Sequence, residues 1–575
     1  MKIKHLFGLA VIAAMTASCS SNEDLGTAGP GTGTNETGIG YATFTINLPS
    51  VSGTRAADAG GAEMNEGTAK EYAVKSATAL IFQKYGSDEG SCKFVESVDL
   101  PTAAADWTDD TTVGITTTKK LVAKLTNVDT KNQYYVLVLL NNNKNKTGGV
   151  KVALPTVGQS YNEWNSQILT PSVDDLAADN DFYMANAPLK GTASPTTLVT
   201  IDKEHIYSSK EKAEAGTSAA TVYVERGVAK MSVTDPTTKT VIDKATNTST
   251  KSTVKFNNWA LDITNKKTYA VHNIDGLSTD FSDIWTTPRF IGTNSRVYWG
   301  KDPNYNLDHL NKTDKEAERE AEFNFIKATS GINKTFTESA YCLENTFNLA
   351  NMYQGQTTRV IFKATYTPMD DAGNPLADKD GTFYTIGNMT TILKEETLKT
   401  AVNTAATSVL PGCTVDYTNL KQEGSHVITL ADIKDSNGTT LVADKVYSGK
   451  TGTEIVKEIN DKLGLIDGAG HAEAMVGINT YAQGVTYYIA RVKHFGSLTP
   501  WNSGESYGTD NGKYLGRYGM LRNNWYELTV GNVYGPGYPG VPPVDPNQPD
   551  DENEKYLSVS VKILSWAKRS DTVDL

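Results

Sequence analysis

The sequence predicts an all-β protein with a few inserted helices, built as β-sandwiches and ending in a detached strand. The body of the chain consists of short apolar or alternating runs separated by turn clusters, and only a few stretches keep helical spacing. At the end, a Pro-rich stretch leads into an isolated alternating run. Regular short strands without long helices between them favour sandwiches over a parallel α/β sheet.

The composition is that of a soluble globular protein with real cores. The chain has 575 residues, 39% of them hydrophobic and 21% charged, and this length suggests roughly two to four domains. The net charge of -12 argues against a nucleic-acid partner. Beyond the leader, no stretch reaches the roughly 18 apolar residues of a membrane span.

The first 19 residues are predicted to be a lipoprotein signal peptide. A basic start and the apolar run Leu6 to Met15 lead to small residues before Cys19, which resembles a bacterial lipobox. Cys19 would then be the lipidated first residue of the mature chain. The alternative is an ordinary secretory signal with a bystander cysteine. Residues 20–40, acidic and then Gly/Thr-rich, form a flexible tether.

Residues 41–55 are predicted to form a removable N-terminal strand with a cleavage loop. The run alternates with a period of two, which is typical of a half-buried strand. Its apolar face consists of Ala42, Phe44, Ile46 and Leu48. Pro49 ends the run, and the small-residue loop behind it carries a single basic residue, Arg55. A trypsin-like protease would cut between Arg55 and Ala56. The alternative is a plain loop arginine.

The body is divided into an N-terminal sandwich at 56–235 and a C-terminal sandwich at 236–534. The strongest strand candidates are 77–82, 134–140, 221–233, 254–263, 359–366, 485–492 and 525–530. Amphipathic helices that cover the sheets are expected at 313–327, 396–410 and 454–463.

The chain ends in a Pro-rich arm at 535–555, followed by a predicted donor strand at 556–575. The arm should be extended and hold the strand away from the last domain. The apolar residues of the strand are Leu557, Val559, Val561, Ile563 and, further on, Trp566. A lone strand cannot bury its own apolar face, so it must add to a sheet edge, either in its own chain or in a neighbour.

No motif in the sequence indicates an enzyme, a cofactor or a metal site. The seven histidines lack metal-ligand spacing, and Ser448–Thr451 only imitates the end of a phosphate-binding loop. Asp378–Gly381 resembles a calcium loop without its bidentate glutamate. Three cysteines remain after Cys19, an odd number, and a bridge between Cys342 and Cys413 stays open.

Several segments resemble the major fimbrillins of Bacteroidia-type (type V) pili, especially the stalk subunit of the short, minor fimbriae. The matching segments are Phe182–Ala187 (FYMANA), Val224–Lys230 (VERGVAK), Tyr518–Tyr526 (YGMLRNNWY) and the Pro-rich end of the chain. Ala185 departs from the hydroxyl residue usual in the first of them. The acidic residues after Cys19 are similar to a surface-export signal of Bacteroidetes lipoproteins.

The resemblance implies two tandem transthyretin-like β-sandwich domains and a lipidated precursor that is exported to the outer membrane. It implies that an Arg-specific surface protease cuts after the first strand, here at Arg55–Ala56. The groove left behind is then filled by the C-terminal strand of another subunit. The contact is head to tail, so it grows a filament.

The sequence therefore predicts a structural, non-enzymatic stalk subunit of a surface fimbrium that promotes adhesion and biofilm formation. Its expected partners are other copies of itself, accessory anchor and tip subunits, the protease, and host or bacterial surface receptors. The alternatives are a non-polymerising surface lipoprotein that binds glycans, an anchor subunit and a tip subunit. The cleavable first strand and the terminal strand together favour the stalk.

Overall fold

The computed structural model describes the greater part of the chain. The described residues are 33–35, 38–48, 64–65, 67–102, 118–129, 131–144, 149–190, 195–234, 236–280, 297, 299–387, 389–465, 477–494, 514–550 and 557–566. The predicted lipidation residue Cys19 and the predicted cleavage site Arg55–Ala56 lie outside them. None of the helices in these ranges is long and apolar enough to cross a membrane.

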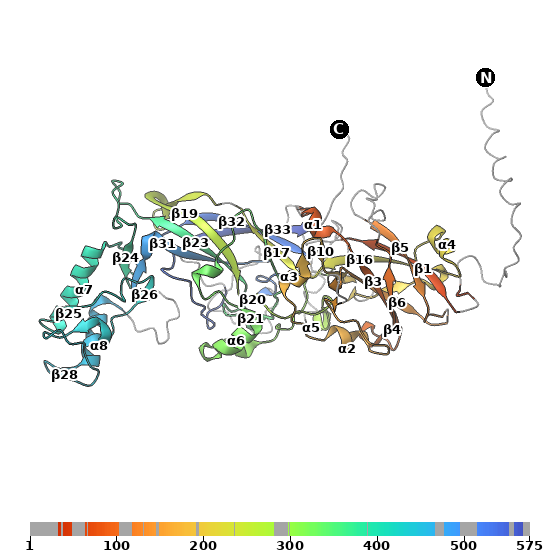
Figure 1. Ribbon diagram of the computed structural model, residues 1–575, viewed down its shortest axis with the longest axis horizontal. Coiled ribbons are helices and arrows are strands. Elements are labelled where there is room, and N and C mark those ends of the chain that lie inside the picture. The colour runs from red at the N-terminus through yellow and green to blue at the C-terminus, as the bar shows by residue number, and fades with distance from the viewer. Residues whose placement is uncertain are drawn as a thin grey trace, which may run out of the picture.

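The molecule is elongated, with two β-rich bodies side by side and a helical lobe at one end (Figure 1). The prediction of a mostly β protein with a few helices is confirmed. The helices with described bounds are α1 (Ala69–Tyr72), α2 (Tyr161–Asn165), α3 (Val173–Leu176), α4 (Lys210–Ala215), α5 (Leu277–Asp280), α6 (Glu316–Glu322), α7 (Glu395–Val409) and α8 (Gly452–Leu463).

The first body is built on a nine-stranded sheet in the order β15-β1-β16-β11-β6-β3-β4, with β14 and β5 as additional partners. Its strands are β1 (Gly40–Asn47), β3 (Ala77–Gln83), β4 (Lys93–Leu100), β5 (Thr118–Leu125), β6 (Tyr134–Leu140), β11 (Met184–Asn186), β14 (Val199–Ile201), β15 (Ile206–Tyr207) and β16 (Ala220–Arg226). The predicted strands at 77–82 and 134–140 are therefore confirmed as β3 and β6. Phe82 and Leu137, fully buried, belong to the core of this body.

The second body has another nine-stranded sheet, in the order β2-β33-β32-β18-β19-β23-β31, with β17 and β22 attached. Its strands are β2 (Met64–Asn65), β17 (Ala229–Val233), β18 (Thr238–Asp243), β19 (Thr248–Asp262), β22 (Ala340–Cys342), β23 (Arg359–Thr367), β31 (Val485–Arg491), β32 (Asn524–Val533) and β33 (Leu557–Trp566). Trp259 and Tyr526 are fully buried in its core.

Short pairs of strands and one three-stranded sheet, in the order β24-β30-β26, complete the fold. They are β7 (Asn143–Lys144), β8 (Gly149–Val150), β9 (Ala177–Ala178), β10 (Asp181–Phe182), β12 (Leu189–Lys190), β13 (Pro195–Thr196), β20 (Thr264–Asn265), β21 (Phe323–Asn324), β24 (Phe383–Ile386), β25 (Thr414–Val415), β26 (Gly424–His426), β27 (Ile433–Lys434), β28 (Val446–Tyr447), β29 (Lys450–Thr451) and β30 (Ile478–Tyr481).

The single strand expected at 221–233 is two strands that belong to different sheets. β16 ends at Arg226 in the first sheet, and β17 begins at Ala229 in the second. At the crossing, the Gly227 amide donates to the Tyr183 carbonyl at 3.0 Å. A Cβ on Gly227 would lie 2.8 Å from the Tyr183 ring, so only glycine lets the two segments approach. The change of sheet depends on this close contact.

The helical lobe contains α7 and α8, which confirm the helices predicted at 396–410 and 454–463. Their apolar faces share a core of Leu398, Val402, Ile455 and Ile459. α8 begins with a capping box between Thr451 and Glu454 and ends at Gly464 in the left-handed conformation. The segment that imitates a phosphate-binding loop is therefore the β28–β29 turn and this helix cap.

The helix expected at 313–327 is shorter than predicted. A 3-10 turn precedes α6, which covers only Glu316–Glu322. The chain leaves the helix at Phe323 because this residue is buried and pairs with β20 through β21. The pairing and burial of Phe323 thus override the charged, helix-favouring pattern that continues beyond it.

The Pro-rich arm packs against the second body, which corrects the expectation that it holds the terminal strand away. The Arg359 guanidinium donates to the carbonyls of Pro542 and Pro543 at 2.7 and 3.0 Å. Tyr538 and Tyr487 exchange backbone hydrogen bonds at 2.7 and 2.9 Å. Prolines offer carbonyls but no amide hydrogens, so a buried arginine with several donors fixes such a segment efficiently.

Candidate functional site

β1 is an inserted strand with a neighbour on each side. It pairs antiparallel with β5 along its whole length, from Gly40↔Leu125 to Asn47↔Thr118. Its second half also pairs parallel with β16, and its start touches β15. A strand between two others leaves two unpaired strand edges when it is removed. Loss of β1 would therefore open a groove inside the sheet, whereas loss of an edge strand would only shorten the sheet by one strand.

The apolar face of β1 is completely buried, as the alternating pattern predicts. The exposed fractions of Ala42, Phe44 and Ile46 are 0%, and that of Leu48 is 2%. Phe44, Ile46 and Leu48 represent roughly 4.5–9 kcal/mol of gross hydrophobic stabilisation, at about 1.5–3 kcal/mol each, and the methyl group of Ala42 adds less. This is the favourable free energy that any replacement strand must recover.

The opposite face of β1 is held by polar contacts. The Thr43 hydroxyl donates to the carbonyl of Ala213 in α4 at 2.6 Å. Thr45 shares a hydrogen bond of 2.6 Å with Ser218. α4 lies beside β1 at the outer end of the first body (Figure 1). The Thr43 contact is buried and the Thr45 contact is partly buried, so they orient the strand while the apolar face supplies most of its affinity.

The groove around β1 is lined mainly by the two neighbouring strands. Its buried walls are formed by Leu121, Ala123 and Leu125 of β5, Ala220, Val222 and Val224 of β16, and Ile206 of β15. In β5 an alanine lies between two leucines, and in β16 an alanine precedes two valines, so an incoming strand with apolar residues at a spacing of two would have apolar neighbours on both sides.

The predicted donor strand forms β33, which lies in the second sheet of the same chain. It runs antiparallel to β32, from Asn524↔Ser565 to Val533↔Leu557. Within this register Val559 faces Val530, Val561 faces Leu528 and Ile563 faces Tyr526. At its far end, Ser565 and Trp566 pair with β2. This is the intramolecular pairing that the sequence left as the alternative, and it keeps β33 away from the groove around β1 (Figure 1).

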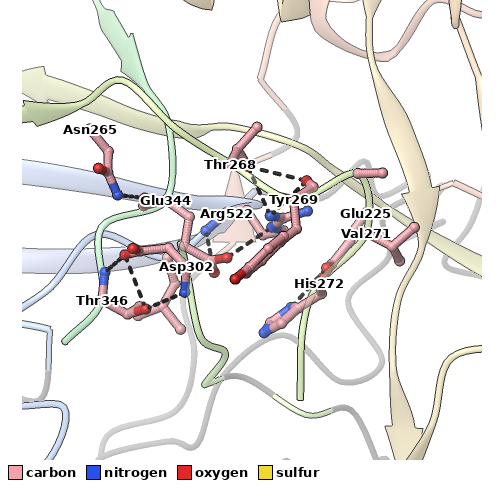
Figure 2. Close-up of polar contacts among 12 residues, drawn as sticks. Glu225, Asn265, Thr268, Tyr269, Val271, His272, Asp302, Glu344, Thr346 and Arg522 are labelled. Atoms are coloured by element: carbon pink, nitrogen blue, oxygen red, sulfur yellow. Dashed lines mark hydrogen bonds and ion pairs between the residues drawn. The ribbon is translucent and has the colours of Figure 1, made fainter. Parts of the chain in front are cut away.

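A group of buried charged residues joins the two bodies (Figure 2). His272 Nδ1 lies 2.9 Å from Glu225 Oε1. Arg522 Nε donates to Glu344 Oε2 at 3.1 Å, and its guanidinium also reaches the Thr268 hydroxyl. Glu225 and Arg522 belong to segments that the sequence analysis singled out. The two segments meet directly, because the Arg226 amide donates to Asn523 Oδ1 at 3.1 Å and the Asn523 amide donates to the Val228 carbonyl at 2.8 Å.

Asp302 lies in the same region, and its carboxyl group has a raised pKa. Its carboxylate accepts hydrogen bonds from the amides of Asn304 and Thr346, each at 2.5 Å. Burial nevertheless raises the pKa of Asp302 to about 7, and the neighbouring charge of Glu344 acts in the same direction. The junction therefore contains a carboxyl group that titrates near neutral pH.

A second buried ion pair ties α1 to the junction. Glu71 accepts from Lys230 Nζ at 2.7 Å and from the Tyr341 hydroxyl at 2.6 Å. Its backbone carbonyl accepts from Arg226 Nε at 2.9 Å. Burial opposes ionisation of Glu71, but the hydrogen bonds and the charge of Lys230 outweigh it, so the pKa lies below its ordinary value.

Sequence reasoning missed most of these junction residues. Glu71, His272, Asp302 and Glu344 each come from a different part of the chain, and no local pattern marks them. A weak signal existed in the charged residues within apolar strand runs, such as Glu225 and Lys230, because a charge is rarely buried without a partner.

The described ranges contain no group of three or more histidine, cysteine, aspartate or glutamate residues placed to hold a metal ion. Cys92, Cys342 and Cys413 are buried free thiols, so the bridge left open between Cys342 and Cys413 is not formed. Asp378, part of the segment similar to a calcium loop, accepts a hydrogen bond from the amide of Glu395 at the start of α7.

Comparison with known families gives one match, in the C-terminal part of the chain. Residues 479–572 match the family described as Major fimbrial subunit protein type IV, Fimbrillin, C-terminal. This match includes β31, β32, the arm and β33. Comparison with curated proteins gives no match.

Solved structures with a similar course of the chain come from related bacteria. A candidate cell adhesion protein from Parabacteroides distasonis is 10% identical, with coverage of 92% of this chain and 97% of the other and a TM-score of 0.36. One from Bacteroides eggerthii is 11% identical, with 93% and 97% coverage and a TM-score of 0.33. The tip fimbrial protein Mfa3 from Porphyromonas gingivalis, with a C-terminal truncation, is 11% identical, with 92% and 100% coverage and a TM-score of 0.27. These scores are too low to carry an argument, and the family match shows that residues 479–572 are similar to the C-terminal region of fimbrillins.

Proposed function

We propose that this protein is the structural stalk subunit of a surface fimbrium and that it polymerises by strand exchange. Cleavage after Arg55 releases β1, and residues 557–566 of another copy enter the groove. The observation that carries the proposal is the position of β1, whose apolar face is buried between β5 and β16 and which precedes Arg55 in the sequence. The role is structural and not enzymatic.

The groove is a better place for the terminal strand than its own domain. In its own chain, β33 has β32 along one edge and only the two residues of β2 on the other. In the groove, a strand gains β5 along its whole length and β16 along half of it. Leu557, Val559, Val561 and Ile563 repeat the spacing of the four apolar residues of β1. The exchange therefore increases backbone pairing, which favours the filament.

The remaining parts of the proposal concern where and with whom the subunit assembles. We place the precursor at the outer membrane, attached through a lipid on Cys19, and the mature form in the fimbrium on the cell surface. An Arg-specific surface protease, anchor and tip subunits, and host or bacterial receptors are its partners. Adhesion and biofilm formation follow from the filament.

Brief trypsin treatment of the purified precursor tests the proposal. Cleavage at Arg55 should give SDS-resistant ladders whose subunits begin at Ala56. Arg55→Gln is the matched control, because it keeps the loop but removes the cleavage site, and it should stay monomeric. Deletion of residues 556–575 should leave a cleavable, folded monomer that cannot extend. A wild-type product that is cut at Arg55 and remains monomeric contradicts strand exchange.

A further inference from the structure

The strand that follows the predicted cleavage site pairs with the end of the terminal strand. β2 lies parallel to β33, with Met64 opposite Ser565 and Asn65 opposite Trp566. At this point β33 is held on both sides, by β32 on one edge and by β2 on the other. Removal of β33 from its own domain must therefore also break the contact with β2.

β2 is fixed because α1, directly behind it, is anchored at the junction of the bodies. The Glu71 side chain is 2% exposed and lies in the ion pair with Lys230. Lys230 Nζ in turn lies 3.5 Å above the ring of Trp525, and Trp525 is opposite Leu564 of β33. Lys230 of β17 and Trp525 of β32 thus connect the anchor of α1 with the end of β33.

We propose that β2 and the Glu71 anchor form a latch that stores the terminal strand on its own domain, and that cleavage after Arg55 loosens this latch. The inference rests on the proposed function. In the precursor, β2 is covalently joined to β1 upstream and to α1 downstream, and it pairs with β33. After cleavage the covalent connection to β1 is lost, and a two-residue strand near a free chain end frays readily. One cut then opens the groove and frees the strand that fills it.

The latch is tested by backbone amide hydrogen exchange at residues 563–566, together with the rate of assembly after cleavage. The double variant Met64→Pro/Asn65→Pro removes both amide donors of β2. In the uncut full chain it should raise exchange at 563–566 by about tenfold or more, because it removes the hydrogen bonds on one edge. The control Met64→Ala/Asn65→Ala keeps the backbone donors and should exchange as the wild type does.

The anchor has its own matched pair of variants on the same helix. Glu71→Gln removes the buried charge partner of Lys230 and should increase exchange at 563–566. Lys70→Gln removes an exposed pair with Asp179, whose side chains are 59% and 68% exposed, and should leave that exchange unchanged. Unchanged exchange in both Glu71→Gln and the double proline variant overturns the latch.

Two further outcomes separate the latch from the proposed function. Cleaved, dilute wild-type protein should exchange faster at 563–566 than uncut protein, and equal rates overturn the coupling to cleavage. The double proline variant should assemble several times faster after cleavage, and an unchanged rate overturns the role of the latch in assembly. If no cleaved variant assembles while the proline variant still exchanges faster, the latch stands and the proposed strand exchange fails.

Discussion

Substitution of Phe44 by alanine tests whether β1 is a separable part of the first body. The ring is fully buried between strands of the core. Loss of a buried phenylalanine costs about 3–5 kcal/mol, which includes the cavity that remains. If β1 leaves the sheet as a unit, this cost lowers only the free energy of its local opening. The opened population should then rise roughly 150- to 5,000-fold.

Hydrogen exchange of the uncut precursor distinguishes local from global opening. In Phe44→Ala, amides of β1 and of the facing edge of β5 should lose protection, while those of β3 and β6 keep theirs. The matched control is Phe82→Ala in β3, an equally buried phenylalanine of the same core. It should weaken protection throughout the body. A uniform loss of protection in Phe44→Ala refutes the reasoning, because β1 would then unfold only with the whole domain.

Three further substitutions probe the junction and the arm. Asp302→Asn should stabilise the protein at neutral pH, since the raised pKa means that wild-type stability is present below pH 3.8 and is lost as the pH rises to about 7. The gain in the free energy of unfolding is at most about 4 kcal/mol. The urea midpoints of the variant and the wild type should differ more at pH 7.5 than at pH 4, and an equal difference at both pH values would contradict the prediction. Arg359→Ala leaves Asp262, 2.8 Å away, buried without its partner. It should cost about 3–5 kcal/mol and expose residues 535–550 to limited proteolysis, and an unchanged cleavage pattern would refute its role in holding the arm. Gly227→Ala should cost about 1–3 kcal/mol through its contact with Tyr183, measured as a lower thermal midpoint, whereas an unchanged midpoint would show that the crossing tolerates a side chain.

The secondary structure and the buried face of a segment could be predicted from the sequence wherever the periodicity of that segment determines them. The alternating run of β1 and the spacing of α7 and α8 correspond directly to buried faces. Pairings between distant segments were not predictable in the same way. β33 fits any sheet edge with apolar pockets, so its alternation alone does not choose between β32 and the groove around β1. The Glu71–Lys230 pair depends on the meeting of β17 and α1, which no local pattern shows.

The predictions for the helix at 313–327 and for the Pro-rich arm were wrong for a related reason. Both have a clear local preference, but tertiary contacts outweigh it. Burial of Phe323 stabilises the protein more than another helical turn would. The carbonyls of Pro542 and Pro543 accept hydrogen bonds from Arg359, which hold the arm against the second body. Local propensity is worth tenths of a kcal/mol per residue, whereas such contacts are worth about 1 kcal/mol or more each.

Under the proposed strand exchange, cleavage is needed because β1 and the terminal strand of another copy compete for the same groove, and β1 has the advantage of belonging to the same chain. β1 is part of the same chain, so its effective concentration at the groove is in the millimolar range. A donor strand from another molecule is present only at the protein's own concentration, and β32 and β2 already hold it. Strengthening the contacts of the donor does not remove this disadvantage, but cutting the chain does, since β1 is then no longer tethered to the groove. On this argument Phe44→Ala should permit slow assembly of the uncut precursor, and a second substitution, Arg55→Gln, should not prevent it. If assembly of Phe44→Ala still requires an intact Arg55, the cut does more than end the advantage of β1, and the loosened latch at β2 is then the remaining reason.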